Sequence, residues 1–167
     1  NHDVSLTVNN KKINAVTNSQ GKALFKLDLA VGSYNALIEF DGDYYYLKSN
    51  ATKMITVKST IYLPTATKYT LNAKYNVKLL DGQGNPLKSK KVDVTIDSKL
   101  LTLTTDGDGN LCYNVNLSVG SHQISIKNPV TGEVKTQTIQ VTVRIAINYD
   151  LTTYYGAGSY YKVRVYD

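Results

Sequence analysis

The chain has 167 residues, which allow one large β-domain or two small ones, and an apolar fraction of 42%, which excludes a disordered chain. Its net charge is +6, but no three basic residues are consecutive, and basic and polar residues alternate. That spread argues against a nucleic-acid partner and favours solvated strand faces. No apolar run approaches the roughly 20 residues of a spanning helix, so we expect no membrane contact within this segment.

Short strands are predicted along the chain. Fourteen tyrosines, with no tryptophan and one methionine, favour strands over helices. Apolar and polar residues alternate, in chain order, over 4–8, 75–79, 92–96, 101–103 and 139–147. Turn signals rich in Gly, Asp and Asn fall at 31–33, 40–43, 81–86, 105–110 and 119–121. We therefore predict an all-β fold.

An internal repeat organises these strands. The block that begins at Asp3 matches the block Val92–Ile126 without a gap, so that Val4 corresponds to Val92, at an offset of 88 residues. A second block that ends at Asp81 matches one that ends at Asp167, at an offset of 86. This period suits a β-sandwich of roughly 100 residues.

The phase of the repeat predicts the domain boundaries. If each unit starts with a strand such as YNVKLLD, residues 1–66 form a domain that lacks its first strand, 67–150 form a complete domain, and 151–167 are the orphan first strand of a following repeat. The alternative phasing is 1–81 and 82–167. An open edge invites strand pairing. We therefore expect strand exchange, in which residues 160–166 complete the edge of 1–66, either in a neighbouring molecule or by folding back.

Five repeated motifs carry a family resemblance. They are Asp81–Leu87, Thr104–Gly109 and Leu117–His122, with Thr17–Gly21 and Leu29–Tyr34 in the first copy. This pattern resembles the bacterial and archaeal immunoglobulin-like (Big-type) repeats of adhesin-like cell-surface proteins, particularly those of methanogens. The resemblance implies tandem immunoglobulin-like antiparallel β-sandwiches, an extracellular location and a structural or adhesive role without catalytic residues. His122 departs from this pattern, because the first copy has Tyr34 in the corresponding position. In many β-sandwiches a Tyr in this place closes a corner of the chain, because its hydroxyl hydrogen-bonds back to the backbone, and we expect His122 to keep one such bond.

The sequence contains no pattern that indicates an enzyme or a cofactor, and we expect neither. The two histidines are His2 and His122, and most acidic residues lie in turns, where they are common anyway. Cys112 is the single cysteine, and by alternation it shares a face with polar residues. A nucleophilic cysteine would need a nearby His and a third group, and nothing in the sequence marks them.

Two motifs suggest metal binding or modification. Asp106, Asp108 and Asn110 alternate as in a calcium loop, but the twelfth position holds Leu117 in place of Glu. The first copy has Asn18, Gln20 and Lys22 in the corresponding places, so a hairpin turn is the favoured interpretation. Asn50 and Asn116 begin N-glycosylation sequons.

Clustered tyrosines are the candidate ligand-binding residues. They are Tyr44, Tyr45, Tyr46, Tyr154, Tyr155, Tyr160 and Tyr161. Tyrosine offers a flat apolar ring with a polar tip, which suits sugars and protein interfaces. The leading hypothesis is a structural and adhesive module of a large extracellular protein, a stalk spacer that also contacts a cell-surface protein or a glycan. The alternative is a carbohydrate-binding accessory module of a secreted protein, favoured if the exposed tyrosines cluster in one copy only.

Overall fold

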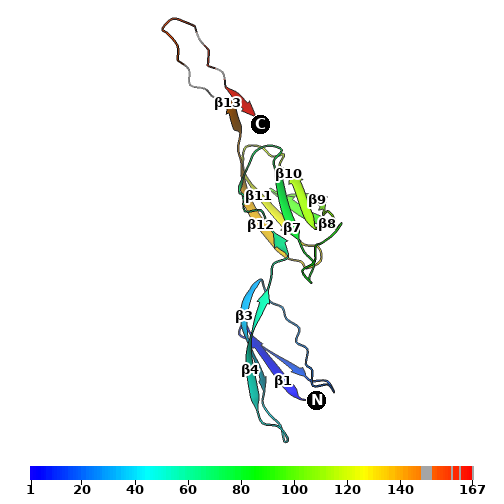
Figure 1. Cartoon of the computed structure of the whole chain (residues 1–167). Helices are drawn as coiled ribbons and strands as arrows, with labels where there is room; N and C mark the ends of the chain where they lie inside the picture. Colours follow the sequence, from blue (N-terminus) through cyan, green and yellow to red (C-terminus); the bar gives the residue numbers. More distant parts are fainter. Residues whose placement is uncertain (148–151, 159, 162, 167) are drawn as a thin grey trace. The chain divides into compact units, whose positions relative to one another are not determined.

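The computed structural model describes residues 1–147, 152–158, 160–161 and 163–166. Every regular element in this part of the chain is a strand, which confirms the all-β prediction. No helix among the described residues has the length and apolar character needed to span a membrane. The chain divides into two compact units, Asn1–Ser59 and Thr60–Asp167. Figure 1 shows both units, coloured along the sequence.

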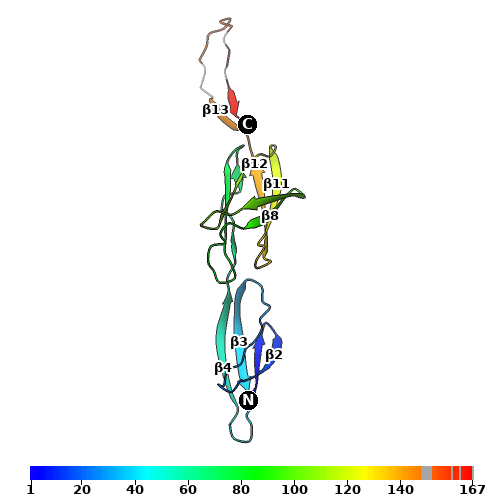
Figure 2. The ribbon, with the colours of Figure 1, turned by 90° about the vertical axis from the view of Figure 1, so that its right-hand side faces the viewer.

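Unit 1 holds one antiparallel sheet of four strands in the order β2-β1-β3-β4. The strands are β1 (Asp3–Val8), β2 (Lys11–Val16), β3 (Gly32–Phe40) and β4 (Ser49–Val57). A two-residue turn joins β1 to β2, and its residues Asn9 and Asn10 have φ angles of 49° and 58°. Asparagine tolerates this left-handed conformation, which matches the twist of a hairpin. In Figure 2, β2, β3 and β4 are seen within this sheet.

The core of unit 1 is small and covers one face of the sheet. Leu6, Val8 and Ala36 are buried in it. The long connection between β2 and β3 packs Phe25 and Leu29 against these residues, although it forms no strand of its own. Figure 1 shows this connection as an extended coil beside the sheet. Unit 1 is therefore a single sheet covered on one face by a loop.

Residues 60–141 of unit 2 form a β-sandwich of two sheets, apart from the β13–β14 pair described below. The smaller sheet has the order β10-β7-β5 and the larger one β6-β12-β11-β8-β9. All pairings are antiparallel except the short β6–β12 pair. The strands are β5 (Ile61–Tyr62), β6 (Lys68–Tyr69), β7 (Lys74–Leu79), β8 (Lys91–Ile96), β9 (Lys99–Thr104), β10 (Asn110–Asn114), β11 (Gly120–Lys127) and β12 (Val134–Val141).

Among the described residues, fifteen buried side chains fill the core of unit 2. Most come from alternate positions in the strands of both sheets, such as Tyr75, Val77 and Leu79 on β7, because successive strand residues point to opposite faces. The Tyr75 hydroxyl donates a hydrogen bond to Gln137 Oε1 at 2.8 Å, which satisfies the one polar atom of this buried ring. Burial raises the pKa of Tyr75, so the hydroxyl stays a proton donor.

The two units repeat the same four strands. Strands β1, β2 and β3 of unit 1 correspond to β8, β9 and β11 of unit 2 in the 88-residue register, and β4 follows β3 as β12 follows β11. The difference is the smaller sheet, which unit 1 lacks. Residues 22–26 correspond to β10 but form no strand, since β10 obtains its hydrogen bonds from β7 and unit 1 contains no counterpart of β7.

Two features lie at the C-terminal end of unit 2. The alternation predicted one strand over 139–147, but β12 ends at Val141 and β13 (Arg144–Ile147) begins after a two-residue break. The break follows from the register, because Val141 pairs with Gly120, the first residue of β11. Strand β14 (Arg164–Tyr166) pairs antiparallel with β13. The boundary predicted near 150/151 lies outside the described residues.

His122 forms the corner expected from the repeat. In unit 1 the Tyr34 hydroxyl donates to Ala30 O at 2.9 Å, and in unit 2 His122 Nε2 lies 2.8 Å from Ser118 O, the corresponding carbonyl. His122 also has a second partner, since its Nδ1 lies 2.5 Å from Asp97 Oδ2. With two acceptors, the ring donates from both nitrogens when it is protonated.

Candidate functional site

The β3–β4 loop of unit 1, residues 41–48, carries the first tyrosine cluster. Asp43 shapes it, because its Oδ1 accepts hydrogen bonds from the amides of Tyr45 at 2.8 Å and Tyr46 at 2.9 Å. The Asp43 amide in turn donates to Tyr46 O at 2.9 Å. The hydrogen bond from the Tyr45 amide is the main reason that the pKa of Asp43 lies below its ordinary value, and the bonds from His2 and from the Tyr46 amide lower it further. The carboxylate thus holds the loop in one shape.

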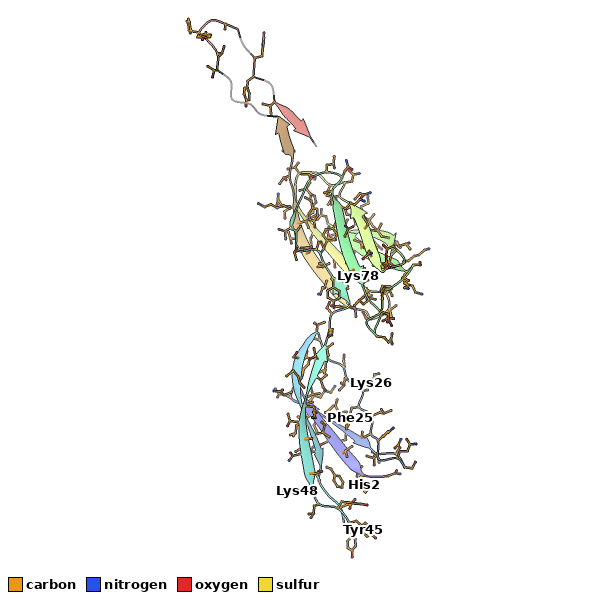
Figure 3. All side chains as sticks on the ribbon, in the orientation of Figure 1. His2, Phe25, Lys26, Tyr45, Lys48 and Lys78 are labelled. Carbon is orange, nitrogen blue, oxygen red and sulfur yellow. The ribbon has the colours of Figure 1, made fainter. Side chains whose placement is uncertain are left out.

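His2 ties the start of the chain to this loop. Its Nδ1 lies 2.7 Å from Asp43 Oδ2. Its ring packs edge-on against Phe40, with centroids 5.5 Å apart, and against Tyr46 at 5.3 Å. Figure 3 shows His2, Tyr45 and Lys48 at the same end of unit 1. The contact between His2 and Asp43 was not predicted, because no local motif links two residues that lie 41 positions apart.

Tyr44 and Tyr45 project from the loop as an aromatic pair. Their rings meet edge to face with centroids 4.9 Å apart. Their exposed fractions are 92% and 82%, so almost the whole of each ring is open to solvent. Tyr46 instead faces His2, as described above. The predicted cluster therefore divides into two outward rings and one ring that supports the loop.

A hollow of about 380 Å³ lies beside this loop. Its wall is mostly apolar and comes from β1 with the residue before it, the end of β3, the β3–β4 loop, the start of β4 and the start of the β2–β3 connection. The lining residues are His2, Val4, Thr17, Gly21, Phe40, Tyr46, Leu47 and Ser49. Leu47 is also among the exposed large apolar side chains. The hollow was not predicted, because its wall joins residues from three separate stretches of the sequence, 2–4, 17–21 and 40–49.

The remaining candidate tyrosines belong to unit 2. Tyr154, Tyr155, Tyr160 and Tyr161 are all exposed. Tyr154 begins a turn in which the Ala157 amide donates to Tyr154 O at 3.1 Å. No ring contact between any of these four is found in the described part of the chain. They present separate aromatic surfaces.

The loop of Asp106, Asp108 and Asn110 is a hydrogen-bonded turn. Asp106 Oδ1 accepts from the amides of Asp108 at 2.9 Å and Asn110 at 2.8 Å, and its Oδ2 accepts from Asn110 Nδ2 at 3.0 Å. Lys78 Nζ donates to Asp108 O, which brings a positive charge to the turn. The amide of Asn110 is the main cause of the lowered pKa of Asp106. The described residues contain no group of three acidic, His or Cys side chains that would hold a metal ion.

The same turn occurs at two other places in the chain, and at one of them, Asn18, it contains no acidic side chain. Asn18 Oδ1 accepts from the amides of Gln20 at 2.9 Å and Lys22 at 3.0 Å, in the position that corresponds to Asp106. Asp81 Oδ1 makes the equivalent bonds to Gln83 and Asn85. A side-chain oxygen that accepts the amides two and four residues later is thus a structural device of this repeat.

The other singled-out residues are exposed. Asn50 lies in β4 opposite Glu39, and Asn116 follows β10, so both sequons are on the surface. Cys112 is exposed in β10 opposite Asn76, on the polar side that its alternation predicted.

No family model and no curated protein matches the chain. Several solved structures, however, are similar to it. A Bacteroides ovatus SGBP-B protein, solved with a mixed-linkage heptasaccharide, is 11% identical over 95% of this chain and 66% of its own, with a TM-score of 0.35. A Ca2+-stabilized adhesin with which an Antarctic bacterium binds ice is 14% identical over 88% of this chain and 43% of its own, with a TM-score of 0.31.

A third similar structure, from a 1.5-MDa bacterial ice-binding adhesin, is 14% identical over 84% of this chain and 52% of its own, with a TM-score of 0.29. This chain thus spans less than two thirds of the length of each of the three. Two of the three are bacterial adhesins, and the first is a glycan-binding protein. At these identities and TM-scores, the similarities place no ligand on this chain.

Proposed function

We propose that this chain is a structural and adhesive repeat module of a large extracellular cell-surface protein, akin to the Big-type repeats of methanogen adhesin-like proteins. The internal repeat carries the proposal. One sequence pattern at an offset of 88 residues produces the same four strands, the same side-chain-capped turn and the same corner hydrogen bond in both units. Such duplication serves a stalk, because stacked repeats add length without new chemistry.

The β3–β4 loop supplies the contact surface. Tyr44 and Tyr45 expose flat rings that stack on sugars or pack into protein pockets at little entropic cost. Asp43 and His2 fix the loop beforehand through bonds of 2.7–2.9 Å, so fewer degrees of freedom are lost when a ligand binds. The partner is a glycan or a protein of another cell's surface.

A glycan array tests this surface. Wild-type protein is expected to bind a defined subset of glycans, and the double variant Tyr44→Ala/Tyr45→Ala to lose that binding by about tenfold or more, since buried aromatic anchors dominate interface energies. The matched control is Tyr154→Ala/Tyr155→Ala, which removes two adjacent exposed tyrosines from unit 2. A blank array for the wild type, or equal binding by both double variants, would remove this surface from the proposal.

A second candidate is a carbohydrate-binding accessory module of a secreted protein. One observation favours it, namely that the tyrosine triplet occurs in one copy only. The β11–β12 loop of unit 2, residues 128–133, has the sequence NPVTGE and no aromatic residue. Sedimentation with insoluble cellulose, xylan and mixed-linkage glucan separates the two candidates. Pull-down that depends on Tyr44 and Tyr45 supports the accessory module, whereas binding to intact cells alone supports the adhesive one.

A further inference from the structure

Three polar side chains lie on the inward face of β12. Glu133, Lys135 and Gln137 occupy alternate positions of the chain, on the same side as the buried core residues Ile139 and Val141. The three are partly buried, whereas the residues between them are exposed. The inward face of a strand normally carries apolar side chains, so a charged or amide group in this place is stabilised only by specific partners.

The partners belong to residues 60–69, which we call the entry segment because unit 2 begins there. Glu133 Oε2 accepts hydrogen bonds from the Thr60 amide at 2.6 Å and from Thr60 Oγ1 at 2.7 Å. Two residues further along β12, Lys135 Nζ donates to Ile61 O at 2.9 Å. Both charged side chains of the row thus bind the first two residues of the entry segment.

Gln137 extends the row to Pro64. Its Nε2 donates to Pro64 O at 2.9 Å, while its Oε1 accepts the bond from the Tyr75 hydroxyl described above. Proline has no amide hydrogen to donate to a strand ladder, and β5 ends at Tyr62. The side chain of Gln137 therefore supplies a bond to β12 where the irregular backbone does not.

Backbone bonds to β12 resume after this point. The Gln140 amide donates to Thr67 O at 2.7 Å, and the Thr142 amide donates to Tyr69 O at 2.9 Å. The short strand β6 pairs with β12 in parallel here. The entry segment thus runs beside β12 in the same direction, bonded first by side chains and then by the backbone.

Asn128 fixes the start of the entry segment from the β11–β12 loop. It is fully buried, and its Nδ2 donates to Thr60 Oγ1 at 3.1 Å and to Leu80 O at 2.8 Å. Thr60 is therefore bonded to both ends of this loop, through Asn128 and through Glu133. The first residue of unit 2 is held by side chains on more than one side.

The parallel arrangement decides how unit 2 responds to a pull along the chain. The chain enters the sandwich at Thr60, at the start of the entry segment, and leaves it after Val141, at the far end of β12. A pull on these two points slides the entry segment and β12 past each other. The bonds between them run across the direction of the pull, so they are loaded together. In a hairpin that is pulled at its open end, they would break one after another.

We propose that the entry segment, held by Glu133, Lys135 and Gln137, is a clamp that resists mechanical unfolding of unit 2. The proposal rests on the stalk function proposed above, because a stalk that joins two surfaces is under tension. The clamp must open before unit 2 can extend. This role accounts for polar side chains at inward positions of β12, since apolar ones would leave backbone groups of the irregular segment without these partners.

Magnetic tweezers at constant force test the clamp in the full chain. In a Cys112→Ser background, handles are attached through Lys58→Cys and Val143→Cys, two exposed positions just outside the clamp. Moving the first handle to Val119→Cys pulls the β11–β12 pair from its open end, where β11 begins and β12 ends. The first geometry is expected to survive the same force for roughly tenfold longer or more, because forced unfolding is governed by the unfolding rate and its bonds must break together.

Lys135→Met tests one bond of the clamp, because it removes the donor to Ile61 O and keeps an unbranched side chain. With handles at 58 and 143, it is expected to shorten the lifetime under force about tenfold, since a bond from a charged donor is lost before the barrier is crossed. With handles at 119 and 143, its effect is expected to be small. The matched control is Thr136→Val, which removes a bond to Ser125 Oγ on the outward face of β12 and is expected to keep the wild-type lifetime.

Glu133→Gln gives an independent measurement at Thr60. It keeps an acceptor oxygen but removes the charge, so a smaller loss of lifetime than that of Lys135→Met is expected. Equal lifetimes of the wild type in the two pulling geometries, or a loss from Lys135→Met that is the same in both, would overturn the proposal. Glycan binding through Tyr44 and Tyr45 is measured separately, so a failed clamp and a failed adhesive surface are distinguishable.

Discussion

His122 shows how one substitution within a repeat changes the chemistry of a corner. Tyr34 closes the corner of unit 1 with a neutral hydroxyl, whereas His122 closes that of unit 2 with a titratable ring. The Asp97 carboxylate is the main cause of a raised pKa of His122, and the Ser118 carbonyl adds to it. His122 in return lowers the pKa of Asp97. The corner therefore depends on pH in unit 2 alone.

The sign of this dependence follows from the two shifts. His122 contributes stability that is fully present below its unfolded pKa of about 6.5 and is lost as pH rises through its higher folded value. Asp97 contributes stability that is present above about 3.8 and is lost as pH falls through its lower folded value. The pair thus stabilises unit 2 in acid to neutral solution, between these limits.

We predict that unit 2 loses stability as the pH rises from about 6.5 through the raised folded pKa of His122. Hydrogen exchange of the β11 amides, corrected for the intrinsic effect of pH on exchange, measures this for unit 2 by itself. His122→Tyr reproduces the corner of unit 1, in which Tyr34 donates to Ala30 O, and is expected to remove the pH dependence. Protection that stays constant over this range in the wild type would show that His122 does not titrate there.

The corner was predictable from the sequence only in part. The alignment of Tyr34 with His122 predicted the bond to the backbone, because the repeat fixes both position and acceptor. The bond to Asp97 was not predicted, since it joins β11 to the β8–β9 turn across 25 residues. That contact requires the left-handed turn at Asp97, with a φ angle of 45°, which the sequence does not display as a motif.

Strand β7 is the element that separates a complete sandwich from an open sheet. The alternation of Tyr75, Val77 and Leu79 predicts a strand there, and the repeat predicts that residues 1–66 contain no counterpart of it. The sequence did not show what happens to residues 22–26 without it. Their pattern matches that of β10, but a strand needs a partner for its backbone groups, so this segment stays a loop that packs Phe25 on the sheet.

Gly21 and Gly109 hold corresponding positions in unit 1 and unit 2, and they give a matched mutational pair. Gly109→Ala places a methyl group 2.6 Å from Leu79 O and must push β7 away, besides straining a φ of 76°. Gly21→Ala has the same strain, of about 1–2 kcal/mol, but no collision. We predict that Gly109→Ala lowers the free energy of unfolding of unit 2 by clearly more than Gly21→Ala lowers that of unit 1, as measured by urea denaturation. Equal losses would mean that the close approach at Gly109 relaxes without cost.

The two units differ in how much apolar surface each buries. The described residues of unit 2 include fifteen that are buried in its core, whereas the core of unit 1 has three, supported by Phe25, Leu29 and other partly buried side chains. Since burial of apolar surface is the main favourable term in folding, unit 1 is expected to be the less stable of the two. Denaturation of the chain is then not two-state, and the β1–β4 amides exchange before those of β7–β12.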